Sequence, residues 1–137
     1  MDVERLRMVK RQILKYPDET NMRHVHSAEG CHCIFGWAQV LFSPRFLDRF
    51  WRGKFVKPTE SISKLFAYLD MSYAEGRRLY HCQLWPNDLN RRYLAAVTDR
   101  QRAAITAEAI ERFIADPGFR NDIAYTSGER MLVEALF

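Results

Sequence analysis

The stretch Cys33-Ile34-Phe35-Gly36-Trp37-Ala38-Gln39-Val40-Leu41-Phe42 decides the fold, because it is the longest apolar run in the chain. Its apolar side chains would lie almost all round a helix, so the pattern predicts a buried, central helix that ends at Ser43-Pro44. Gly36 costs about 1 kcal/mol relative to alanine inside a helix. We therefore expect a second helix to cross closely over Gly36.

Helical spacing of apolar residues and capping signals extend outward from this run. Ser72 with Glu75 and Thr98 with Gln101 form two capping boxes, Asp2 and Asn87 are candidate N-caps, and Ser127 is a candidate cap for a last helix. The predicted helices span residues 3–15, 33–42, 44–52, 59–69, 72–81, 87–97 and 98–115. The fold class is therefore mainly all-α, a compact bundle of six or seven short helices with at most a minor hairpin involving residues 22–26 or 122–126.

The chain of 137 residues, with 47% apolar and 28% charged residues, is sufficient for one folded domain. We expect a helical domain at residues 1–118 and a C-terminal tail at 119–137 that packs on it or on a partner. No apolar run has the length of a membrane span, and Met1-Asp2-Val3-Glu4-Arg5 does not resemble a secretion signal. Three cysteines without an export signal favour reduced thiols and a cytoplasmic protein.

Several segments together resemble a family of small helical proteins from bacteriophage and actinobacterial genomes. The main signature is Cys-x-x-Gly-Trp-Ala, which stands here as residues 33–38, and the likeness covers about residues 3–115. Relatives usually carry Cys-Gly-Thr before the buried helix, where this chain has Ala28-Glu29-Gly30. The resemblance implies a bacterial or phage setting, in which small helical proteins are often inhibitors or regulators.

Five potential metal ligands gather within ten residues, and they are His24, His26, Cys31, His32 and Cys33. Histidine and cysteine bind Zn²⁺ or Cu⁺, and Cys33 at a helix start could also act as a nucleophile beside a histidine. The ligand spacing matches no standard finger, and Ile34 and Phe35 suggest that Cys33 faces the core. We favour the structural interpretation, and predict no metal and no other cofactor.

A basic and aromatic segment follows the central helix at residues 45–57. On a helix, its arginines at i, i+4 and i+7 would form one stripe opposite the aromatic side chains, which suits phosphate contact with base stacking or an acidic protein surface. Residues 1–57 carry 11 Lys and Arg against 6 Asp and Glu, which favours a binding role for this half. The candidate contact residues are Arg45, Arg49, Trp51, Arg52, Lys54 and Lys57.

These patterns favour a non-enzymatic interaction protein of phage or mobile-element origin that binds and masks a macromolecular partner. A bacterial defence complex such as CRISPR-Cas is one candidate target, which would make the chain an anti-CRISPR type of inhibitor, and a homodimer is compatible with the sequence. One alternative is a nucleic-acid-binding regulator that uses residues 45–57. The other is a small metal-binding protein or cysteine-dependent enzyme centred on residues 24–33.

Overall fold

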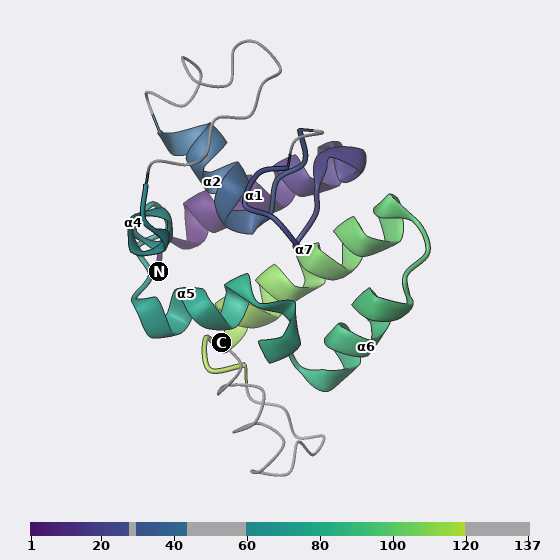
Figure 1. Ribbon diagram of the computed structural model, residues 1–137. Helices are drawn as coiled ribbons and strands as arrows, with labels where there is room; N and C mark the ends of the chain where they lie inside the picture. Colours follow the sequence, from purple (N-terminus) through teal and green to yellow (C-terminus); the bar gives the residue numbers. More distant parts are fainter. Residues whose placement is uncertain (28–29, 44–59, 120–137) are drawn as a thin grey trace.

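The described part of the fold consists of α-helices with two short 3₁₀ turns, as the computed structural model in Figure 1 shows. The structure describes residues 1–27, 30–43 and 60–119. The helices in these ranges are α1 (Val3–Lys15), α2 (Ile34–Phe42), α4 (Ile62–Ala67), α5 (Tyr73–Tyr80), α6 (Asn87–Ala95) and α7 (Asp99–Ala115), with 3₁₀ turns η1 (Pro17–Glu19) and η2 (Cys82–Leu84). The described ranges contain isolated bridges but no named strand, so the predicted all-α class is confirmed.

Local capping explains where most of these helices begin. The Asp2 carboxylate accepts from the Arg5 backbone N–H at 3.0 Å, and both predicted capping boxes form at the starts of α5 and α7. Asn87 is not a cap, because α6 already begins at Asn87 and Pro86 holds the N-cap position without a side-chain bond. Proline is well suited to a helix start because it has no N–H to leave unpaired.

The core lies where α1, α2 and α7 meet. Helix α7 contacts α1, α5, α6 and η1, whereas α2 packs against α1 and α4. Residues 34–39 of α2 are buried, as the apolar run predicts, and Trp37, Trp85 and Tyr93 are buried as expected. Phe119, the first residue of the predicted tail, is buried beside Phe113, with ring centroids 5.2 Å apart, so the core reaches this residue.

The loop between η1 and α2 is irregular. Instead of an extended piece at residues 22–26, it has two single bridges, which pair His32 with Thr20 and with His26. A Cβ on Gly36 would lie 1.8 Å from the backbone oxygen of Val25, so the close approach at Gly36 is made by this loop. The expected helix crossing was wrong, although the expected tight contact is present.

Some predicted elements lie outside the described residues. These are the helix at 44–52, the contact residues at 45–57 and nearly all of the tail at 119–137. Among the helices that the structure describes, none combines the length and apolarity required to span a membrane.

Candidate functional site

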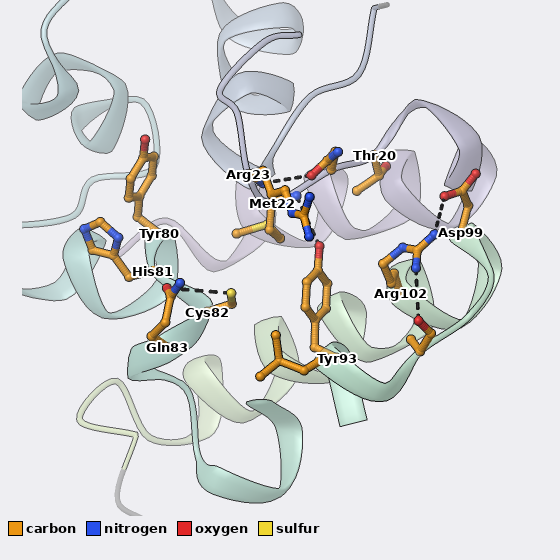
Figure 2. A pocket seen from close by; sticks show the side chains of 13 residues that line it. Thr20, Met22, Arg23, Tyr80, His81, Cys82, Gln83, Tyr93, Asp99 and Arg102 are labelled. Carbon is orange, nitrogen blue, oxygen red and sulfur yellow. Dashed lines mark hydrogen bonds and ion pairs between the residues drawn. The ribbon is translucent and has the colours of Figure 1, made fainter. Parts of the chain in front are cut away.

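A cleft of about 780 Å³ lies between the irregular loop and the α5–α7 side of the molecule (Figure 2). Four segments that are distant in sequence line it. They are residues 20–23 after η1, residues 80–83 at the end of α5 and in η2, Tyr93, Leu94 and Ala96 around the end of α6, and Asp99 and Arg102 of α7. The volume is in the range of ligand-binding clefts, so this is the candidate site.

Hydrogen bonds fix the loop wall of the cleft. The Met22 backbone N–H donates to the Tyr93 hydroxyl at 3.2 Å, and the Asn21 N–H donates to the His32 carbonyl at 3.0 Å. Trp37 donates its indole N–H to the Thr20 hydroxyl at 3.1 Å. The wall is therefore tied to α6 on one side and to the start of α2 on the other.

Arg23 and Arg102 bring positive charge to the cleft in different ways. Arg102 donates to the Ala96 carbonyl at 3.1 Å and to the Asp99 carboxylate at 2.9 Å, so its charge is largely compensated. Arg23 is exposed, and within the described residues its guanidinium has neither a hydrogen bond nor an ion pair. The side chain of Arg23 is therefore available to an anionic group that enters the cleft.

Cys82 and His81 lie on the opposite wall, and both favour their neutral forms. Burial raises the pKa of the Cys82 thiol, and the opposing attraction of the Arg23 charge is weaker. Burial and the positive charge of Arg77 lower the pKa of His81. A neutral thiol is a poor nucleophile, so this wall offers hydrogen-bonding and apolar contact.

Two exposed apolar side chains stand at the same corner of the molecule. Leu94, which lines the cleft, is 72% exposed, and Val97, in the α6–α7 connection, is 82% exposed. Scattered exposed apolar side chains are ordinary, but Leu94 lines the cleft that contains the available arginine, and Val97 follows three residues later in the chain. The corner therefore combines charge and apolar surface.

The predicted histidine and cysteine cluster is divided by the structure. His26 and His32 are buried and their Nδ1 atoms lie 2.7 Å apart, whereas His24 is exposed and the Cys31 thiol donates to the Asp18 carbonyl at 3.4 Å. Within residues 1–27, 30–43 and 60–119, no three His, Cys, Asp or Glu side chains are placed to hold a metal ion.

Cys33 faces the core, as its apolar neighbours predict. Its side chain is fully buried and caps α2 by accepting from the Gly36 N–H at 3.5 Å. Burial raises the pKa of the thiol to about 11, although nearby backbone N–H groups favour the thiolate. This environment gives an unreactive thiol, which argues against the nucleophile hypothesis for this residue.

The sequence interpretation missed Arg23, Arg102, Leu94 and Val97 as site residues. The sequence did indicate that Leu94 is exposed, because Leu89 and Tyr93 form the buried stripe of α6 and Leu94 falls outside that stripe. Arg23 carried no local signal, since its role depends on α6 and α7 being packed opposite the loop.

Comparison of the chain with protein-family models, curated proteins and solved structures finds no match in any of the three. The function is therefore argued from the residues and their geometry.

Proposed function

We propose that this chain is a non-enzymatic interaction protein that binds a protein partner at the Arg23 cleft and masks the bound surface. The observation that carries the proposal is the available Arg23 guanidinium in a cleft that the exposed Leu94 also lines. Arginine is one of the residues enriched among the binding hot spots of protein interfaces.

The cleft favours a partner segment with one acidic side chain next to an apolar one. Arg23 would pair with the carboxylate, and the Tyr93 hydroxyl, which accepts from Met22, retains its own proton to donate. Leu94 and Val97 would cover the apolar neighbour. Nucleic acid fits this corner less well, because Arg102 is paired with Asp99 and, among the described residues that line the cleft, Arg23 alone offers a charge to the several phosphates that a nucleic acid presents.

The proposed setting is a phage or mobile element whose product acts in the host cytoplasm on a bacterial defence complex such as CRISPR-Cas. The likeness of residues 33–38 to phage and actinobacterial proteins supports this setting. A small helical protein that covers a functional surface of its partner needs no catalytic group, which agrees with the neutral thiols of Cys33 and Cys82.

The test is to capture partners from a bacterial lysate, identify a stoichiometric complex and measure its dissociation constant by titration. We expect Arg23→Glu to weaken binding at least tenfold, and the double variant L94S/V97S to weaken it by a similar factor. The matched control is Arg11→Glu, because Arg11 is exposed on α1 and does not line the cleft. Binding unchanged in both cleft variants would refute the proposed contact.

A third variant addresses the basic segment outside the described residues. If residues 45–57 supply the main contact, the charge reversal R45E/R49E/R52E will weaken binding with the helical content retained, while Arg23→Glu has no effect. Retention on DNA or RNA that falls steeply as salt is raised would instead support the nucleic-acid alternative. These outcomes separate the cleft from the segment and a protein partner from a nucleic acid.

A further inference from the structure

Two histidines meet inside the loop that forms one wall of the cleft. His26 is 6% exposed and His32 is 4% exposed, and their rings meet edge to face with centroids 4.9 Å apart. The Nδ1 atoms are 2.7 Å apart, which is a hydrogen-bonding distance. We call these two residues the histidine pair.

The hydrogen-bond network assigns the protons of the pair. Gln39 donates its amide N–H to Glu60 Oε2 at 3.0 Å, so its oxygen Oε1 accepts from His26 Nε2 at 2.6 Å. A neutral His26 that carries its proton on Nε2 has a lone pair on Nδ1. His32 must therefore donate from its own Nδ1 in the neutral pair.

This geometry accommodates one added proton but not two. If His26 gains a proton, His32 can change tautomer and accept at Nδ1, which preserves the contact. A second proton would place two N–H groups head-on at 2.7 Å in a buried site, where neither charge is well solvated. The pair must then separate.

Within the described residues, charged and titratable groups lie near the pair on several segments. Glu60, bonded to the Tyr68 hydroxyl at 2.8 Å and paired with Lys64 at 3.6 Å, lies beyond Gln39. Tyr16, Asp18 and Glu19 lie along the η1 segment, and Cys31 and Cys33 flank His32 in the chain. Burial is the main cause that lowers the pKa of both histidines, and for His32 the pKa falls to about 4, with His26 as a further cause.

His32 is also tied directly to the cleft wall. Its backbone N–H donates to the Glu19 carbonyl at 2.8 Å, and its carbonyl accepts from Asn21 at 3.0 Å. Its ring meets the Trp37 ring with centroids 4.6 Å apart, and Trp37 holds the Thr20 hydroxyl. Movement of the His32 ring would thus disturb the segment that carries Arg23.

We propose that the histidine pair is a pH-sensitive latch that holds residues 20–23 in the cleft wall while neutral and releases them when doubly protonated. The latch holds at neutral pH and opens as the pH falls below the ordinary range of histidine. The inference rests on the proposed function in one respect, namely that the released segment contains the partner-binding Arg23.

The test follows the ¹⁵N-labelled protein by NMR between pH 7.5 and pH 4. We expect His26 to carry its proton on Nε2 and His32 on Nδ1 at pH 7.5. On acidification, the amides of residues 20–23 and the Trp37 indole N–H should change together with one midpoint below pH 6. The amides of α1 and α7 should remain protected through that midpoint.

Variants assign the change to the pair. His32→Asn retains an amide N–H near the Nδ1 position but removes the titrating ring, so the midpoint should move by at least half a pH unit. The control His24→Gln removes an exposed histidine of the same loop and should leave the midpoint in place. If His32→Asn fails to fold, the tautomers and titration of the wild-type pair still decide the matter.

Two results would overturn the latch. The first is a loop that remains unchanged down to pH 4, and the second is a loop that changes only when α1 and α7 unfold with it. The NMR measurement needs no partner, so it is separable from the binding test. A loop that opens at low pH while Arg23→Glu has no effect on binding would refute the proposed contact and leave the latch standing.

Discussion

Gly36 shows how a single residue fixes the position of the irregular loop over α2. A Cβ at this position would overlap the Val25 backbone oxygen at 1.8 Å, and backbone cannot move aside as a flexible side chain can. We expect Gly36→Ala to lower the free energy of unfolding by about 1–2 kcal/mol, because overpacking outweighs the helix propensity gained. Urea unfolding measures this change.

Ala104→Gly is the matched control for Gly36→Ala. Ala104 is exposed in α7, so this reverse exchange should cost only the propensity difference of about 1 kcal/mol. A Gly36→Ala protein as stable as the wild type would show that the loop does not press on α2.

Gly76 is comparably crowded, since a Cβ there would lie 2.3 Å from the Phe66 ring. No sequence pattern marked Gly76 as a position of close contact.

At the scale of the elements, the capping box of α7 is the clearest local determinant. The Thr98 hydroxyl accepts from the Gln101 N–H at 3.1 Å, and the Gln101 side chain accepts in return from the backbone N–H of Thr98 at 3.1 Å. We expect Thr98→Ala to lower the free energy of unfolding by about 1 kcal/mol. Thr98→Ser keeps the hydroxyl and should retain most of the stabilisation that the cap provides. Thermal unfolding compares the two, and an equal loss in both would exclude the hydroxyl as the cause.

Helix positions were predictable because their determinants are local. Asp2, Ser72 and Thr98 act within three residues of their own helices, and α1 runs from Val3 to Lys15 as the apolar spacing predicts. The predicted end of the 87–97 helix was wrong by two residues, since α6 stops at Ala95 and leaves Val97 in the connection to α7.

The cleft was not predictable, because its contacts are not local. The Met22 N–H and the Tyr93 hydroxyl are 71 positions apart in the sequence, and no periodicity reports such a pairing. Tyr93 was correctly expected near the core, but its hydroxyl bond to the loop required the fold. The histidine pair is an intermediate case, because His26 and His32 were singled out as metal ligands, whereas in the structure they contact each other.

For the whole molecule, buried groups that must remain neutral set the pH range of stability. Folding lowers the pKa of His26 and His32, so the unfolded chain binds more protons below about pH 6.5. Their stabilising contribution is therefore complete above pH 6.5 and is lost as the pH falls towards 4. Asp88 and Glu111, whose pKa values are lowered by Arg112 and by Lys10 with Arg7, add a further loss at still lower pH.

Cys33 sets the alkaline limit of stability, because folding raises its pKa whereas folding lowers the pKa of the two histidines. Burial raises its pKa from 9.0 to about 11, so the unfolded chain loses its proton first and stability falls as the pH rises through that interval. Stability should thus be highest between about pH 6.5 and pH 9.

From pH 7.5 to 4.5 we expect the two histidines to account for a loss of about 1–2 kcal/mol in the free energy of unfolding. Urea unfolding at pH 4.5, 5.5, 7.5 and 10 tests both limits. His32→Asn should reduce the acid loss and Cys33→Ala the alkaline loss, each leaving the other side unchanged. If stability is the same at pH 4.5 and 7.5, the histidine pair does not remain neutral in the folded chain, and the acid limit must have another origin.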